Sequence, residues 1–144
     1  LLRESISESL SIYKPYKNDL SVKVNLVPEF LEEVDNYVLG NFPEFEVCWY
    51  GHIGDGNLHL NILKPENLSI EDFNEYGHTM SPKIFNIIKK KKGSISAEHG
   101  VGILKRDFLE YSRSASEIDY MISLKQVFDP HQILNPGKLL RAKI

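Results

Sequence analysis

Hydrophobic and polar positions follow two different periods along the chain, which predict a mixture of helices and strands. Helical spacing extends over four segments: 1–12, 28–41, 70–92 and 115–128. Strand-like alternation or short apolar runs fill four others: 20–27, 46–53, 58–63 and 94–96. The predicted order is helix, strand, helix, strand, strand, helix, strand, helix, which favours an α+β fold with helices on one side of an antiparallel sheet.

Turn formers and caps mark the ends of these segments. Residues 13–18 contain a proline and are predicted to be a loop. Pro28 fits the first turn of a helix, and Ser69 fits an N-cap. Pro82 is expected to interrupt or kink the long third helix. Ser114 with Glu117 forms a capping box for the last helix.

A cluster of turn residues, 54–57, predicts a hairpin flanked by Ile53 and Leu58. This pairing sets position 52 opposite 59 and position 50 opposite 61. Since side chains alternate along a strand, one face is polar and the other is almost purely apolar. The polar face carries Tyr50, His52, His59 and Asn61; the apolar face carries Trp49, Gly51, Ile53, Leu58, Leu60 and Ile62.

The polar face holds two histidines, and the short run 96–102 adds Glu98 and His99. Directly opposed residues have Cβ atoms about 4.5–5.5 Å apart, close enough for His52 and His59 to bind one ion. Two imidazoles, a carboxylate and a spare imidazole are the parts of an open metal site with a base beside it. Asp55 is interpreted as a turn residue and not as a ligand.

Composition narrows the classes of function. The length of 144 residues fits one domain, and the net charge of −3 gives no general attraction to nucleic acid or anionic membranes. The lysines at 89–92 are interpreted as complementing a helix C-terminus. The lone Cys48 excludes a disulfide within the chain and a cysteine-based zinc site. Because the sequence begins at Leu1 without methionine, we expect an excised domain or a natural fragment.

Four motifs in this order resemble the C-terminal domain of the FAD-linked oxidases of the vanillyl-alcohol oxidase type. The resemblance covers essentially the whole chain, and it is nearest to members that act on D-2-hydroxyglutarate, with D-lactate and glycolate oxidisers as near relatives. The motifs are Tyr16–Asp19, Gly51–His59, Ser96–Gly102, and Phe128–Pro130 followed by Ile133–Lys138.

The resemblance implies a ferredoxin-like α+β domain, an antiparallel sheet with helices packed on one face. Residues 1–144 would be a single C-terminal substrate and metal domain, and the N-terminal FAD-binding domain of the family is absent from the sequence. FAD would be bound mainly by that absent domain. We therefore expect this chain alone to bind FAD poorly and to be inactive.

The resemblance also implies residue roles. His99 would be the catalytic base, and Asn135 would face the flavin. A divalent metal, zinc or manganese, would be bound by His52, His59 and Glu98; the substrate would be held by Arg3, Ser7, Lys17 and Asn61. Lys105 and Arg106 follow the Glu98–His99 loop and are interpreted as a solvated helix start, with a contact to the surroundings of the flavin as the alternative.

The implied activity is the oxidation of a D-2-hydroxy acid, of the D-2-hydroxyglutarate or D-lactate type, to the 2-oxo acid, with hydride passing to flavin. The expected partners are the FAD-binding domain and an electron acceptor such as an electron-transfer flavoprotein, a quinone or a cytochrome; a homodimer stays open, and the expected compartment is cytoplasmic or mitochondrial. Two alternatives use the same ligands without flavin: a metal-dependent hydrolase and a non-catalytic metal-binding module.

Overall fold

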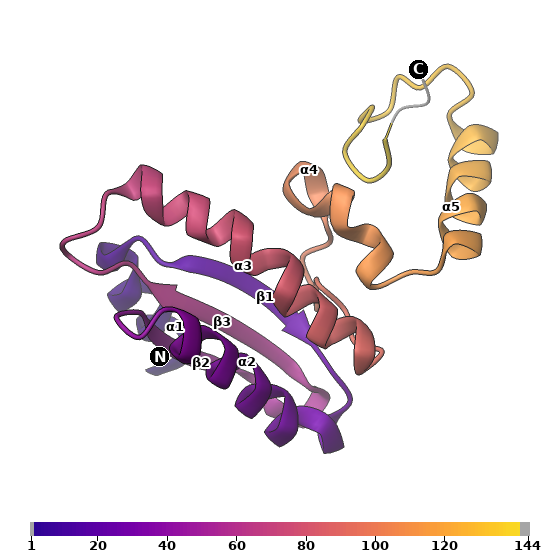
Figure 1. Cartoon of the computed structure of the whole chain (residues 1–144). Helices are drawn as coiled ribbons and strands as arrows, with labels where there is room; N and C mark the ends of the chain where they lie inside the picture. Colours follow the sequence, from indigo (N-terminus) through magenta and orange to yellow (C-terminus); the bar gives the residue numbers. More distant parts are fainter. Residues whose placement is uncertain (1, 142–144) are drawn as a thin grey trace.

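The computed structural model describes the backbone of residues 2–141 and the side chains of residues 5–141. Within this part, β1 (Tyr16–Ser21), β2 (Glu46–His52) and β3 (Asn57–Leu63) form one antiparallel sheet in the order β1-β3-β2. Helices α2 (Val27–Asn41) and α3 (Ile70–Lys90) cover one face of this sheet, while α1 (Leu2–Leu10) lies behind it in the view of Figure 1. The prediction of an α+β fold is confirmed.

The hydrophobic core lies between the sheet and the α2–α3 layer. Alternate strand positions supply its floor, and each helix supplies one apolar stripe. Burial of each large aliphatic or aromatic side chain contributes about 1.5–3 kcal/mol to folding. The core includes Leu20, Leu58, Leu60 and Ile62 from the strands, Phe30, Val34 and Val38 from α2, and Phe73, Met80, Ile84 and Ile88 from α3.

Local signals placed the ends of both covering helices correctly. Pro28 lies in the first turn of α2, and the Ser69 hydroxyl accepts a hydrogen bond from the backbone N–H of Asp72 at the start of α3. Pro82 does not interrupt α3, which continues as one element to Lys90. A Schellman-type end follows, because Lys92 has a φ of 54° and the Gly93 N–H donates to the Ile88 carbonyl.

The first strand was placed wrongly. The expected loop over 13–18 and strand over 20–27 are replaced by a short 3-10 helix (Ser11–Tyr13), β1 (Tyr16–Ser21), and a second 3-10 helix (Val24–Leu26) that leads into α2. Lys17 and Asp19 lie on the face away from the core, so the strand is mostly polar and resembles a loop. The strand expected at 94–96 is a single antiparallel bridge between Ser21 and Ser94.

The C-terminal third consists of α4 (Gly102–Lys105), a 3-10 helix (Arg106–Tyr111) and α5 (Ala115–Phe128). The capping box of Ser114 and Glu117 is present. Helix α5 has no buried residue and stands apart from the sheet (Figure 1). Its exposed apolar side chains include Tyr120, Leu124, Val127 and Phe128. Among the described helices, none combines the length and the apolarity that crossing a lipid bilayer requires.

The hairpin turn contains the 3-10 helix Ile53–Asp55 and ends at Gly56. Gly56 lies against Val22, the residue that follows β1. Its φ is 75°, and a Cβ there would lie 1.9 Å from the Val22 carbonyl oxygen. We expect Gly56→Ala to lower the free energy of unfolding by about 2–4 kcal/mol, through left-handed backbone strain and this overlap. Gly54→Ala is the matched control, because no atom lies within 4 Å of its added Cβ. Urea unfolding checks both variants; equal stabilities would contradict the turn geometry.

Candidate metal and substrate site

The sheet face opposite the core gathers polar side chains from all three strands. In the observed register Asp19 pairs with His59 and Lys17 pairs with Asn61 across β1 and β3. Across β2 and β3, Tyr50 pairs with His59, and His52 pairs with Asn57. The hairpin register is therefore two residues from the predicted one. The predicted faces survive because side chains alternate with a period of two, so an even shift changes partners and not sides.

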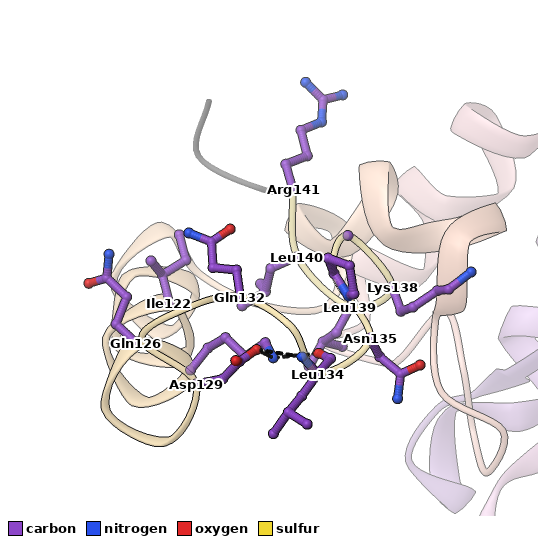
Figure 2. Close-up of a pocket in the computed structure, with 13 residues that line it drawn as sticks. Ile122, Gln126, Asp129, Gln132, Leu134, Asn135, Lys138, Leu139, Leu140 and Arg141 are labelled. Carbon is purple, nitrogen blue, oxygen red and sulfur yellow. Dashed lines mark hydrogen bonds and ion pairs between the residues drawn. The ribbon is translucent and has the colours of Figure 1, made fainter.

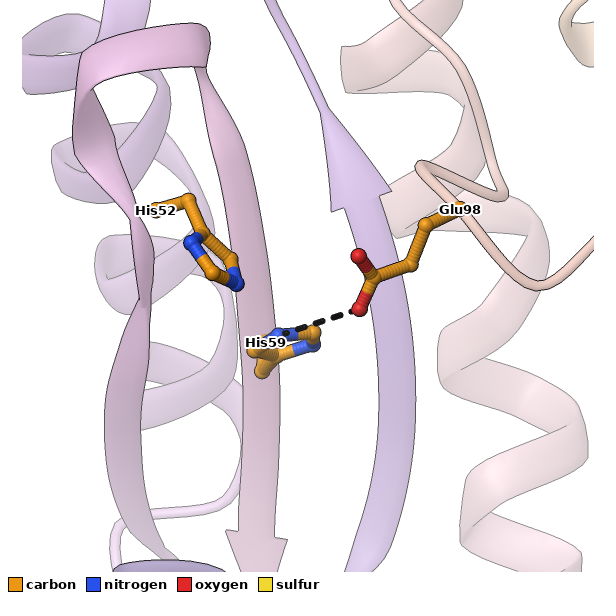
Figure 3. Close-up of side chains that lie close together, drawn as sticks. All are labelled: His52, His59 and Glu98. Atoms are coloured by element: carbon orange, nitrogen blue, oxygen red, sulfur yellow. Dashed lines mark ion pairs between the residues drawn. The ribbon is translucent and has the colours of Figure 1, made fainter. Parts of the chain in front are cut away.

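The three predicted metal ligands, His52, His59 and Glu98, lie close together. His52 and His59 are diagonal neighbours and not direct partners, with ring centroids 6.3 Å apart. Glu98, on the loop before α4, brings its Oε1 to 3.9 Å from His59 Nε2. Figure 3 shows the Glu98 carboxylate turned toward the imidazoles. One ligand atom from each of the three residues can be chosen so that all lie within 4.8 Å of one another.

His99 lies next to this cluster on the same loop. Its Nε2 is 3.3 Å from Glu98 Oε1, and its side chain is 72% exposed. The loop is fixed by Asp19, whose Oδ2 accepts backbone hydrogen bonds from Glu98 N at 3.0 Å and His99 N at 3.3 Å. A further hydrogen bond runs from the Ser96 hydroxyl to the Gly100 carbonyl at 2.9 Å.

A cavity of about 510 Å³ opens beside these residues. Ser7 from α1, Lys17 from β1 and Asn61 from β3 line it, so the structure brings together three of the four predicted substrate-binding residues. The fourth, Arg3, has a side chain outside the described residues. Asn61 is buried, its amide N–H donates to the His59 carbonyl at 3.3 Å, and its Oδ1 has no hydrogen-bond partner among the described residues.

Lys105 was assigned to a solvated helix start, and this assignment is wrong. Its ammonium group donates to the Ile95 carbonyl at 2.8 Å, lies over the Phe85 ring, and lines the same cavity. Burial lowers the pKa of Lys105 from the usual 10.5 to about 8, and the negative charge of Asp19 partly opposes this shift. The sequence held no signal for this burial, because it depends on how the 96–101 loop returns to the sheet.

The lowered pKa of Lys105 predicts how the free energy of unfolding should change with pH. Between pH 8 and 10.5 the unfolded chain binds more protons at this site than the folded protein does, so stability should rise with pH across that window. We expect Lys105→Met to lose this rise, whereas Lys83→Met, a change on the exposed face of α3, should keep it. Urea unfolding at pH 7.5 and pH 10 measures the difference; identical pH slopes in all three proteins would contradict the burial.

Asn135 does not join the site. It lines a separate cavity of about 280 Å³ between the end of α5 and the C-terminal turn, together with Ile122, Leu134 and Leu139 (Figure 2). The carboxylate of Asp129 organises this turn by accepting backbone N–H groups from Ile133 and Leu134. None of the described residues that line this second cavity also lines the first.

Comparison with known proteins agrees with the resemblance. The family model for FAD linked oxidases, C-terminal domain, matches residues 2–139. A D-2-hydroxyglutarate dehydrogenase of Stutzerimonas stutzeri is 56% identical over 98% of the chain, and one of Xanthomonas citri pv. viticola is 48% identical over 96%. The mitochondrial D-2-hydroxyglutarate dehydrogenase of Danio rerio is 39% identical over 96%.

The chain spans 30%, 29% and 25% of the lengths of these relatives, respectively. The match therefore concerns one domain of a larger enzyme, and it includes the hairpin, the Glu98–His99 loop and α5. The family match, the α+β fold and the high identity over nearly all of the chain lead to one conclusion: this chain belongs to the C-terminal domain family of the FAD-linked oxidases.

Proposed function

We propose that this chain is the substrate- and metal-binding part of an FAD-dependent dehydrogenase that oxidises a D-2-hydroxy acid, of the D-2-hydroxyglutarate type, to the 2-oxo acid. The observation that carries the proposal is the convergence of His52, His59 and Glu98 at the edge of a cavity lined by Lys17 and Asn61. Relatives with the name D-2-hydroxyglutarate dehydrogenase support the choice of substrate class.

The three converging side chains fit a divalent metal. Two imidazole nitrogens and one carboxylate oxygen form a donor set suited to zinc or manganese, and three protein ligands leave coordination positions for a substrate. The ligand atoms lie within 4.8 Å of one another, a spacing that small side-chain movements can close to a common centre. A bound divalent ion would lower the pKa of the substrate hydroxyl and fix its orientation.

Lys17 and Asn61 are proposed to bind the substrate's carboxylate and hydroxyl groups. They are paired across β1 and β3, so their side chains leave the same face of the sheet. The Lys17 side chain is exposed, which leaves its ammonium group accessible to a distal carboxylate. Ser7 adds a hydroxyl from α1 at the cavity wall, and Arg3 is proposed to add a second cation from the same helix.

His99 is proposed to take the proton of the substrate hydroxyl. Histidine is the commonest general base in proteins, and His99 lines the cavity, with its Nε2 3.3 Å from Glu98 Oε1. FAD held by the other domain would supply the acceptor for the C2 hydrogen, which would leave as hydride, so that the substrate would become a 2-oxo acid. His99 is well exposed, so a flavin domain docked over the cavity would be needed to exclude water.

The FAD-binding domain is proposed to cover α5 and the C-terminal turn, including Asn135. The apolar side chains of Leu124, Val127 and Phe128 are 59%, 73% and 79% exposed, and burying them would favour association with another domain. The complete enzyme would also require an electron acceptor, for which an electron-transfer flavoprotein, a quinone and a cytochrome are the candidates.

A substrate screen tests the proposal. The flavoprotein that carries this chain should reduce its flavin with D-2-hydroxyglutarate, lose that activity on chelation, and regain it with zinc or manganese. D-lactate, glycolate and the L-enantiomers serve as comparisons that define the substrate class. Unchanged flavin reduction after complete removal of divalent metal would contradict the metal's role, and hydrolytic turnover without flavin would favour the hydrolase instead.

A further inference from the structure

The carboxylate of Asp19 lies close to both parts of the proposed metal site, the sheet that carries His59 and the loop that carries Glu98. It lies directly opposite His59 in the β1–β3 register, and its side chain is 12% exposed. Its Oδ1 is 3.5 Å from His59 Nδ1, and its Oδ2 accepts the backbone hydrogen bonds of Glu98 and His99. We propose that Asp19 is a positioning residue that aligns His59 on the sheet with Glu98 on the loop, an inference that rests on the proposed function.

The contact with His59 determines which ring nitrogen is available. A carboxylate beside Nδ1 favours the tautomer that carries its proton there, which leaves the Nε2 lone pair free for a metal. Nε2 is the atom that lies 3.9 Å from Glu98 Oε1. Oδ1 has no geometric hydrogen-bond partner among the described residues, so it is available to accept the Nδ1–H of His59.

The contact with the loop sets the position of Glu98 and His99. Hydrogen bonds to an ionised carboxylate are stronger than neutral ones, and Oδ2 accepts two of them from consecutive backbone amides. The Ser96 hydroxyl lies 3.5 Å from the same oxygen, which extends the attachment along the loop. The Asp19 side chain therefore holds Glu98 and His99, which lie 79 and 80 residues further along the sequence.

The charge of Asp19 also acts on Lys105. Lys105 is close enough for its pKa to be raised by Asp19, although burial of the lysine is the larger effect. A purely structural role, an ion pair that holds α4 against β1, is the competing explanation. The two explanations differ in what they predict for the ring of His59, because an ion pair with Lys105 places no demand on its tautomer.

Asp19→Asn is the most informative variant, because it keeps the shape and replaces one accepting oxygen with an NH₂ group that cannot accept. The affinity for zinc, measured with a competing chromophoric chelator, should fall about 10–100-fold, the usual effect of losing a carboxylate behind a ligating histidine. Asp119→Asn, on the exposed surface of α5, should bind zinc like the wild type.

Two measurements on metal-free protein test directly whether Asp19 positions His59 and the loop that carries Glu98. ¹⁵N chemical shifts should report the Nδ1–H tautomer of His59 in the wild type and a mixture in Asp19→Asn. Amide exchange at Glu98 and His99 should accelerate about tenfold in the variant, as expected for losing a hydrogen bond to a charged group. An unchanged tautomer and unchanged exchange would overturn the role of Asp19. Failure of the wild type to bind zinc would instead overturn the proposed function, and these two measurements would still decide the role of Asp19.

Discussion

Replacing Glu98 with glutamine is expected to lower both divalent-metal affinity and the rate of flavin reduction on the order of a thousandfold. The glutamine keeps an oxygen at the same position but removes the only negative charge among the three proposed ligands, and metal charge stabilisation of this kind contributes several kcal/mol. Metal affinity is measured by competition with a chelator, and flavin reduction by stopped-flow absorbance.

Glu98→Gln is suited to this test because the fold does not depend on its carboxylate. The Glu98 side chain is 46% exposed, and the loop is held by backbone groups that the substitution leaves in place. Glu66→Gln, at an exposed loop position between β3 and α3, is the matched control and should change neither quantity. Retention of wild-type metal affinity by Glu98→Gln would remove Glu98 from the ligand set.

Replacing His99 with alanine is expected to reduce kcat by about 10²–10⁴-fold, the usual contribution of a general base. Metal affinity should stay within about threefold of the wild type, because His99 is not one of the three proposed ligands; a larger loss would favour a second set of donor atoms within 4.8 Å of one another, those of Asp19, Glu98 and His99.

The matched control for His99→Ala is His78→Ala, since His78 is an exposed histidine on α3, the helix that covers the opposite face of the sheet. Its kcat and metal affinity should match those of the wild type. Wild-type kcat in His99→Ala would show that proton transfer uses another group, and Lys105, which lines the same cavity, would be the next residue to test.

The residues on the polar face of the β2–β3 hairpin could be predicted from sequence, but the cross-strand register of the two strands could not. As expected, the same face of the hairpin carries Tyr50, His52, His59 and Asn61. The glycine-rich turn located the hairpin, and the alternation of side chains along each strand assigned these residues to one face. The turn lies one position earlier than predicted, between His52 and Asn57, and this changed every cross-strand partner. Sequence patterns do not resolve such a shift, because both registers bury the same apolar residues.

Asp19 and β1 were missed for a related reason. The outward-facing positions 17 and 19 of β1 are both charged, so the pattern of this strand resembles a loop. The strand is held by backbone hydrogen bonds to β3 that no side-chain pattern reports. Lys105 was missed because its burial depends on contacts with Ile95 and Phe85, which are distant in sequence.

The helix α5 illustrates the opposite case, in which the element was predicted and its packing was not. Ser114 and Glu117 start the helix as expected, since a capping box is a local device. Its apolar residues follow helical spacing, yet Val127 and Phe128 are 73% and 79% exposed. Apolar periodicity predicts that a face will be covered, but it does not identify the covering partner.

X-ray diffraction from crystals of the flavoprotein that carries this chain, grown with zinc and recorded at its absorption edge, tests the central claim most directly. We predict one anomalous peak bounded by nitrogens of His52 and His59 and an oxygen of Glu98, at about 2.0–2.2 Å from each. Zinc at another position, or no peak among these three residues at a zinc concentration that saturates activity, would contradict the proposed metal site.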